Sequence, residues 1–348
     1  MIKRRNLDNS LVQWIMTQTN LGPGIGKIKY VAPAAAATAQ YRTMLEENGV
    51  DSGDIYTSLA SAYAAIVTRR NDIIIAAPAL YTLTAEVAWA IDNAHLLGMG
   101  TGLPHADWTL TPNIPIFYTA TTDQANILNL TGEANSFRNV IFENYGANAA
   151  CLNAVTVNGY LNSFIDVAFH GIMTTAQVAQ EACCSLNIAA GGHYPLFRRC
   201  EIGTREWGTR TSTTSGHLRF TGASGGGPGH GRFDDCTFSS RAETAGVPMV
   251  YMVGLRAATS LWRFTNCLFY NFWNNWEGMC DSVFQNPTSG QNTCSIVLED
   301  CTAVGYTEWQ QREFKGVTYT NEGWIMTNMP ITGTAGGLTK LPTGTVGS

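Results

Sequence analysis

Charged residues are scarce in this chain, and lysine is the scarcest of them. Only 14% of the 348 residues are Asp, Glu, Lys or Arg, and lysine occurs just five times. Soluble domains usually carry about a quarter of charged residues. The net charge is −5. A chain of this kind has little to offer a phosphate backbone, so the composition excludes a typical nucleic-acid-binding protein.

Long apolar runs, CxxC pairs and a recognisable secretory signal peptide are also lacking. No apolar run approaches the roughly 20 residues that a membrane-spanning helix needs, so no membrane partner is expected. Nine cysteines are present, an odd number. Together these features indicate synthesis in a reducing compartment, without a disulfide framework, and we expect no metal or other cofactor.

One phrase of six residues recurs six times between residues 137 and 303. Its first, fourth and sixth positions are mostly apolar, and its second and third are mostly polar. Successive copies begin 27 to 36 residues apart. Such a period is typical of stacked repeats, in which each unit buries its apolar face only against its neighbours. The copies begin at Phe137, Phe164, Phe197, Phe233, Phe264 and Leu298.

Each phrase predicts a strand of five or six residues followed by a polar turn, because no helical spacing of apolar residues runs through it. A second strand pattern precedes most phrases, as at residues 128–132, 155–159 and 218–222. Two or three short strands per unit, wound into a coil, predict an all-β parallel β-helix, a solenoid. Neighbouring coils would lie about 4.8 Å apart, so equivalent residues would form columns.

Two columns follow directly from the phrase. The first position stacks aromatic rings, and the fourth stacks cysteines. A metal or redox site is one reading of the cysteines, but Val140 and Val167 hold the same position in earlier copies. A column of small buried apolar residues is therefore favoured. The predicted core ladder comprises Phe137, Phe164, Phe197, Phe233, Phe264, Cys200, Cys236, Cys267 and Cys301.

The chain divides into four parts by composition. Residues 1–40, which are rich in Gly and Ala and basic at the tip, predict an extended N-terminal arm that stays mobile or docks on another surface. Residues 41–72 predict a helical cap, with helices over 41–48 and 57–70, because the first coil of a solenoid needs cover. Residues 73–325 form the predicted β-helix. The Gly/Thr-rich residues 326–348 predict an irregular C-terminal tail.

Three groups of residues could carry chemistry. A glycosidase needs two carboxylates roughly 5 to 10 Å apart, and the pairs Asp234-Asp235 and Glu299-Asp300 are candidates. Asp235 and Asp300 share a phrase position with Asn139 and Asn266, which favours a polar turn ladder. For a lyase, Arg198-Arg199 beside Glu201 is the best match. The glycine-rich residues 225–231 lack the Lys-Ser/Thr ending of a phosphate loop, and His193, His217 and His230 could ligate zinc only if they converge.

Aromatic residues are densest between residues 262 and 309. They exceed what the interior of one coil can hold, so some are expected on the outside. Exposed aromatic clusters usually mark protein contacts or sugar-stacking sites. A subunit interface is favoured over packing under loops and over glycan binding. The predicted interface residues are Trp14, Phe272, Trp273, Trp276 and Trp309.

The N-terminal third resembles a known group. The carrying segments are Thr57-Ser-Leu-Ala-Ser-Ala-Tyr-Ala-Ala-Ile66, Arg70-Asn-Asp-Ile-Ile-Ile-Ala-Ala-Pro78, Tyr81-Thr-Leu-Thr84 and Ala94-His-Leu-Leu-Gly98. They resemble the capping helix and first coils of pectate-lyase-like right-handed β-helix proteins, and more narrowly the β-helix structural proteins of tailed bacteriophages. The resemblance implies a right-handed solenoid and a homotrimer on the virion, on the head or projecting from the tail. It carries over no catalytic residue.

The sequence therefore predicts a non-enzymatic virion structural protein, made in the host cytoplasm. In this hypothesis a homotrimer decorates or cements the capsid and binds the major capsid protein or other virion proteins. The alternative is a tail fibre or tailspike that binds, and perhaps cleaves, a host surface polysaccharide. A secreted polysaccharide lyase is a third hypothesis, which the free cysteines disfavour. Were the protein an enzyme, it would be a polysaccharide hydrolase or lyase.

Overall fold

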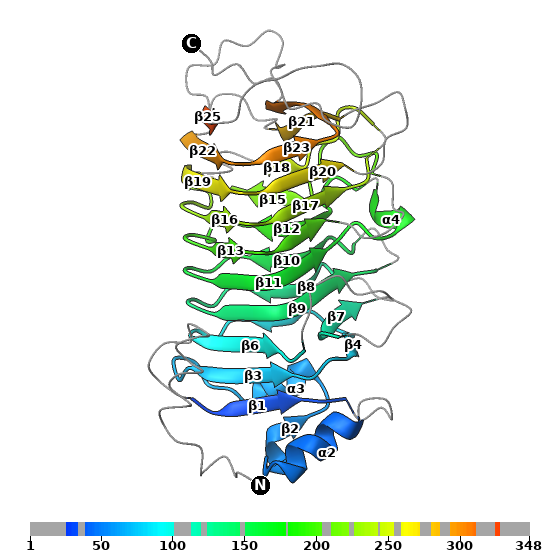
Figure 1. The fold of residues 1–348 in the computed structure, drawn as a ribbon, viewed down its shortest axis with the longest axis vertical. Helices are drawn as coiled ribbons and strands as arrows, with labels where there is room; N and C mark the ends of the chain where they lie inside the picture. The colour runs from blue at the N-terminus through cyan, green and yellow to red at the C-terminus, as the bar shows by residue number, and fades with distance from the viewer. Residues whose placement is uncertain are drawn as a thin grey trace.

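The computed structural model is a parallel β-helix whose coils stack along the long axis of the molecule (Figure 1). Within the described residues every strand pairing is parallel, and the strands form one sheet of 17 and one of 8, here called sheet A and sheet B. The structure describes residues 26–33, 39–100, 113–119, 124–146, 150–178, 180–203, 210–222, 226–242, 244–253, 259–271, 280–285, 293–310 and 324–327.

Sheet A receives two successive strands, or one long bent strand, from most coils, and sheet B receives one. Sheet A contains β1 (Ile28–Val31), β2 (Ile55–Tyr56), β3 (Asp72–Ala76), β4 (Leu80–Thr82), β6 (Ala94–Gly98), β7 (Ile116–Thr119), β9 (Ser136–Asn144), β11 (Ser163–His170), β13 (Leu196–Arg198), β14 (Glu201–Gly203), β16 (Arg232–Asp234), β17 (Thr237–Ser240), β19 (Thr259–Thr265), β20 (Leu268–Asn271), β22 (Thr293–Glu299), β23 (Thr302–Val304) and β25 (Trp324–Thr327). Sheet B contains β5 (Val87–Trp89), β8 (Asn126–Leu130), β10 (Asn153–Val157), β12 (Cys184–Ile188), β15 (Leu218–Thr221), β18 (Val250–Val253), β21 (Cys280–Gln285) and β24 (Tyr306–Gln310).

The first phrase position forms a continuous stack of aromatic rings along the axis. Phe164 lies between Phe137 and Phe197 in strand register, and Phe233 and Phe264 extend the column. Ring centroids are 4.5 to 5.1 Å apart, and successive planes lie within 13° of parallel. The five rings are fully buried. Equal phrase positions therefore lie above one another, and the column runs through the centre of the core.

The third phrase position is a hinge, and here the sequence prediction was wrong in one respect. The phrase is not a single strand with a turn after it, because the turn lies inside it. One residue with positive φ, between 50° and 56°, lies at the third position of each of the six phrases, where it bends or divides the sheet-A strand. Asn and Asp tolerate this left-handed conformation better than other non-glycine residues, which explains their frequency at this position. The hinge residues are Asn139, Asp166, Arg199, Asp235, Asn266 and Asp300.

The N-terminal end of the core is covered by α3 (Leu59–Ala64). Ser58 caps this helix by accepting a hydrogen bond from the amide of Ser61, and Leu59 and Ala62 are buried in the core. The helix is shorter than the predicted span of 57–70. Arg69 and Asn71 both have positive φ, so the helical conformation ends before them. Only the six residues of α3, and not the whole predicted helix, therefore cover the end of the core.

The other helical segments lie outside the stack of coils. The helix α2 (Ala39–Glu47) packs through Leu45 on a small cluster with Ile55, at the N-terminal end of the molecule (Figure 1). A short 3-10 turn, η2 (Ser52–Asp54), follows it, and α4 (Thr175–Val178) lies beside sheet A. None of the helices in the described part of the chain is long and apolar enough to cross a membrane.

The predicted segment boundaries need two corrections. Residues 28–31, assigned to the arm, form strand β1, which pairs in register with β3 and so belongs to the first coil. At the other end, β25 pairs with β22, so the solenoid continues to Thr327, past the predicted boundary at 325. Residues 1–25 of the predicted arm and residues 328–348 of the predicted tail lie outside the described residues.

Candidate functional site

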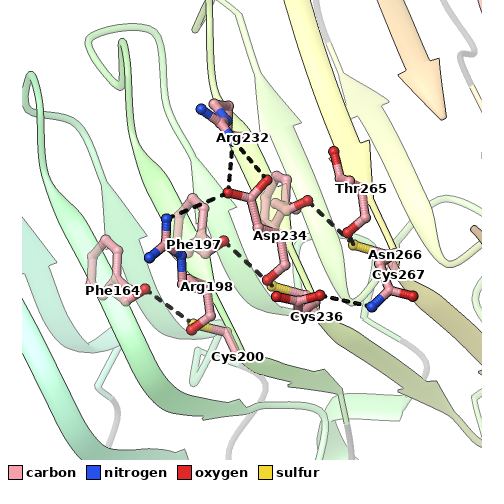
Figure 2. A network of polar contacts seen from close by, with 12 residues as sticks. Phe164, Phe197, Arg198, Cys200, Arg232, Asp234, Cys236, Thr265, Asn266 and Cys267 are labelled. Atoms are coloured by element: carbon pink, nitrogen blue, oxygen red, sulfur yellow. Dashed lines mark hydrogen bonds and ion pairs between the residues drawn. The ribbon is translucent and has the colours of Figure 1, made fainter. Parts of the chain in front are cut away.

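The outer face of sheet A carries a ladder of charged side chains, at the phrase's second position and at the position just before the phrase. Phe197, Phe233 and Phe264 point into the core, so the residues on either side of each point outward. Asp234 lies centrally in this ladder, and its carboxylate is mostly covered. The Nη2 atom of Arg232 is 3.0 Å from its Oδ2 atom, and that of Arg198 is 4.0 Å away (Figure 2).

The same pairing continues along the sheet. Glu299 lies 3.8 Å from the Nε atom of Arg263, and it accepts a hydrogen bond of 3.3 Å from the Thr265 hydroxyl. The hinge residues also bridge neighbouring coils. Arg199 donates two hydrogen bonds of 2.7 Å to Asp166.

Another hinge pair follows one coil further on. The amide of Asn266 donates a hydrogen bond of 2.7 Å to the carboxylate of Asp235 (Figure 2 shows Asn266). Both residues have positive φ at the third phrase position. Hinge residues are thus joined in two pairs, each between neighbouring coils on the outside of the solenoid.

The described carboxylates on this face contact basic or amide groups. A glycosidase uses one carboxylic acid and one carboxylate that both face the substrate. Here Asp166, Asp234 and Glu299 each meet an arginine, and Asp235 meets an amide. Exposed ion pairs of this kind contribute about 0–1 kcal/mol each. The arrangement holds successive coils together and balances their charge.

Glu201, a candidate lyase residue beside Arg198-Arg199 in the sequence, contacts a buried histidine. Its carboxylate lies 3.5 Å from the Nε2 atom of His170, and Glu143 lies 2.8 Å from the Nδ1 atom on the other side of the ring. His170 and Glu143 are fully buried. The three residues form an acid–imidazole–acid triad.

The triad holds His170 as an imidazolium. Burial alone would lower the pKa of His170, but the hydrogen bonds to Glu143 and Glu201 outweigh it and raise the pKa to about 9. The proton therefore stays on the ring at neutral pH. A cation between two carboxylates in the interior stabilises the fold as a network, because removing one member leaves buried charge behind.

We expect the stability of the protein to fall as the pH rises from about 6.5 to about 9. An unfolded histidine has a pKa near 6.5, so the contribution of folded His170 is complete below that pH and is lost as the pH passes about 9. The loss is on the order of 3 kcal/mol. Urea unfolding at several pH values measures it. In His170→Gln this component should vanish, and an unchanged pH profile in that variant would contradict the assignment.

Sheet B presents a different surface, made of neutral polar side chains. Its strands alternate, so that leucines and valines point inward while one column points outward, half-buried for the most part. The column shows no carboxylate at any of its seven described positions. Strand register places these residues in file: Ala88, Asn129, Thr156, Asn187, Arg219, Tyr251 and Gln285.

Hydrogen bonds link this column from coil to coil. Glu86 accepts hydrogen bonds from the amides of Asn126 and Asn129, at 2.7 and 3.0 Å. Further along, Asn187 accepts one of 2.8 Å from the Thr221 hydroxyl. The amide and hydroxyl groups therefore have fixed orientations. Such a surface can bind polar groups through its amide and hydroxyl side chains.

The cysteine column lies in the core beside the aromatic stack. Each thiol of the phrase can donate to the carbonyl of the phrase's first residue one coil below, at Sγ to O distances of 3.3 to 3.6 Å (Figure 2). Burial raises the pKa of the Cys236 thiol well above its ordinary value. Buried cysteines of this kind pack as small apolar residues. The column comprises Cys200, Cys236, Cys267 and Cys301, and the eight cysteines whose side chains the structure describes are all free and buried.

The three candidate zinc ligands do not converge. His217 is buried and hydrogen-bonds Ser185 at 2.9 Å, whereas His193 and His230 lie in turns that stack on tyrosines. Within the described ranges, no three His, Cys, Asp or Glu residues are placed to hold a metal ion. In the glycine-rich loop, a Cβ atom at Gly231 would overlap the ring of Trp262. This glycine thus allows a close backbone approach to a core indole.

The predicted aromatic interface is wrong at Trp309. Its side chain is only 3% exposed and packs edge-on against Phe269, with centroids 5.7 Å apart. Strand register sets Trp309 level with Val283, a core residue, so the indole fills the interior. The other predicted interface residues, Trp14, Phe272, Trp273 and Trp276, lie outside the described residues.

Sequence reasoning missed the His170 triad and the column on sheet B. The only signal for the triad is that Glu143 and His170 each follow the sixth phrase residue, in successive coils. For sheet B the signal is the Asn, Thr and Asn at the fourth residue of β8, β10 and β12. Both signals emerge only when the register is known.

Comparisons with known proteins give relatives in structure alone. No protein-family model matches the chain, and no curated protein matches its sequence. The pectin methylesterase of Aspergillus niger matches with a TM-score of 0.54 and 13% identity, over 88% of this chain and 85% of that one. A pectin methylesterase mutant in complex with a hexasaccharide matches with a TM-score of 0.50 and 12% identity, over 86% and 93%.

A viral protein overlaps more loosely. ORF18 of Geobacillus virus E2 gives a TM-score of 0.43 at 12% identity, over 79% of this chain and 58% of that one. A match at that level supports neither a fold nor a role. The likeness to the two methylesterases shows the fold: the chain is a right-handed parallel β-helix.

Proposed function

We propose that this chain is a structural protein of a tailed-phage virion, in which the β-helix presents fixed surfaces and catalyses no reaction. The observation that carries this proposal is the pairing of the outer-face acids. Asp166, Asp234 and Glu299 are each held by an arginine, and the outward column of sheet B has no carboxylate at its described positions. A hydrolase that attacks sugars needs two acids free to meet substrate.

Within this role we place the protein on the capsid, as a homotrimer that decorates or cements the head. The support is the resemblance of segments 57–66, 70–78 and 94–98 to phage β-helix structural proteins. A rigid, rod-shaped protein with few charged residues is suited to a structural role in which other virion proteins hold it in place. Its partners would be other copies of itself and the major capsid protein.

A tail fibre or tailspike is the second candidate, and one observation favours it. The outward column of sheet B places amides, hydroxyls, an arginine and a tyrosine in file along the axis. Neutral hydrogen-bonding groups suit the recognition of sugar hydroxyls. In that case the protein would bind a host polysaccharide along sheet B.

We expect the purified protein to release no methanol from methyl-esterified pectin and no new reducing ends from host surface polysaccharide. A pectin methylesterase and a glycosidase serve as positive controls in the two assays. Immunogold microscopy of intact particles should label the head. Labelling of the tail, together with binding to the polysaccharide, would replace the capsid role with the second candidate. New reducing ends or methanol would contradict the non-enzymatic proposal itself.

A further inference from the structure

Large apolar side chains are exposed in one row, in three of four successive coils, and His230 holds the position in the remaining coil. Tyr160, Leu161 and Tyr194 lie in the turns that lead from sheet B to the first strands of sheet A, at the left edge of Figure 1, and Leu261 lies near the start of β19. The exposed fractions are 60% for Leu161, 49% for Tyr194, 43% for Tyr160 and 39% for Leu261. We call this row, with His193 and His230, the turn stripe.

The turn that leads into sheet A contains a left-handed residue in successive coils. Leu161, Tyr194 and His230 have φ of 57°, 55° and 61°. In the earlier coils the same position is held by Asn71, Asn93 and Ala134, at φ of 57°, 52° and 54°. Asparagine adopts this conformation readily, whereas bulky side chains rarely do. Leucine and tyrosine are therefore held here at a cost that asparagine avoids, and strain of this kind is found at functional positions.

The ring geometry disfavours a sugar as the occupant. Tyr194 and His230 stack with centroids 4.9 Å apart and planes within 7°, and Tyr160 packs on His193 at 4.8 Å. Each tyrosine ring is therefore partly covered by a neighbouring imidazole, which leaves less open aromatic face for a sugar. A sugar stacks on an open aromatic face, whereas edges and methyl groups pack against a similar apolar surface.

Charge and spacing point to a second copy of the chain. The stripe contains no Asp, Glu, Lys or Arg, so two copies in the same register meet without like charges opposed. On the neighbouring face of sheet A, the same register would set Arg232 against Arg232 and Arg263 against Arg263. The stripe also repeats once per coil, about every 4.8 Å. A partner that contacts successive coils must repeat its own contacts at the same spacing along the axis. A second copy of the chain with a parallel axis does so.

We infer that the turn stripe is a self-association surface, along which copies of this chain lie side by side with parallel axes. Leu161 and Tyr194 of one copy then pack against the same residues of another. This inference rests on the homotrimer in the proposed function and names the surface that forms it. The strained backbone is the cost of placing apolar groups where only a neighbouring copy covers them.

The test is the mass of the protein in solution, by sedimentation equilibrium, for wild type and the double variant Leu161→Asn/Tyr194→Asn. Asparagine occupies this turn in the first coils, so the variant should fold with an unchanged far-UV circular dichroism spectrum. We expect wild type at three times the chain mass of 37.7 kDa and the double variant at one. Leu268→Asn, an equally apolar exposed site on β20, is the control and should remain trimeric.

Two results would overturn the inference. A double variant that stays trimeric removes the turn stripe as the interface but leaves the proposed homotrimer standing. A monomeric wild type removes both the stripe interface and the homotrimer, while the particle-labelling experiment still decides the place of the protein on the virion. Dissociation of the Leu268→Asn control would show that the loss of an exposed apolar side chain outside the turn stripe also breaks the assembly. That result would count against the turn stripe as the specific interface.

Discussion

Phe197→Ala is expected to lower the free energy of unfolding by about 3–5 kcal/mol. The ring of Phe197 lies between those of Phe164 and Phe233, at centroid distances of 4.9 and 4.5 Å, and it is fully buried. Alanine would leave a cavity in the middle of the stack. The coils above and below are tied by sheet hydrogen bonds and cannot close it. Urea unfolding followed by circular dichroism measures the loss.

Phe197→Leu provides the matched control. Leu298 already occupies this column next to Phe264, so the column accepts leucine. A change that keeps most of the apolar volume should cost less than about 1.5 kcal/mol. If the alanine variant were as stable as the leucine variant, filling this site would contribute nothing to stability, and the column would not hold the coils as we describe.

Removing the imidazolium of the buried triad is expected to have an effect of the same size. In His170→Gln, the carboxylates of Glu143 and Glu201 lose the cation between them. Breaking a buried charge network by removing one member typically costs 3–5 kcal/mol. Urea unfolding at pH 6, where the contribution of His170 is complete, gives the largest difference from wild type.

A double-mutant cycle with Glu143→Gln isolates the pair. The two single changes should each destabilise the protein, and the double change should cost less than their sum, because each single variant already loses the same contact. Additive effects would mean that His170 and Glu143 do not interact. The same cycle with Leu268→Asn should be additive, because Leu268 is an exposed apolar residue two coils beyond Glu201.

The columns were predictable because the repeat itself encodes the register. Once Phe137, Phe164 and Phe197 are aligned, every other phrase position is aligned with them, and the structure pairs these residues in that register. The hinge inside the phrase was not predictable in the same way. A single left-handed residue leaves the strand pattern on both sides intact, and Arg199 hides the Asn/Asp preference at that position.

The parts that sequence reasoning missed depend on how the outside is covered. Glu143 and His170 point away from the coil interior, so their pattern predicts exposed polar residues, yet both are fully buried. The prediction that Trp309 lies at an interface was wrong for the opposite reason. Counting aromatic residues suggested an excess for the interior, but sheet B contributes a last strand, β24, that places this indole inside. Neither outcome follows from one repeat taken alone.

The coils differ in their number of residues, and this determines where the fold can accommodate insertions. A coil advances the axis by about 4.8 Å whether it contains 27 residues, as from Phe137 to Phe164, or 36, as from Phe197 to Phe233. An α-helix would gain the same length with about three residues. Extra residues therefore widen the flanks and leave the pitch untouched. New bulges, grooves or contact points can be added at the sides of the rod without disturbing the spacing along it.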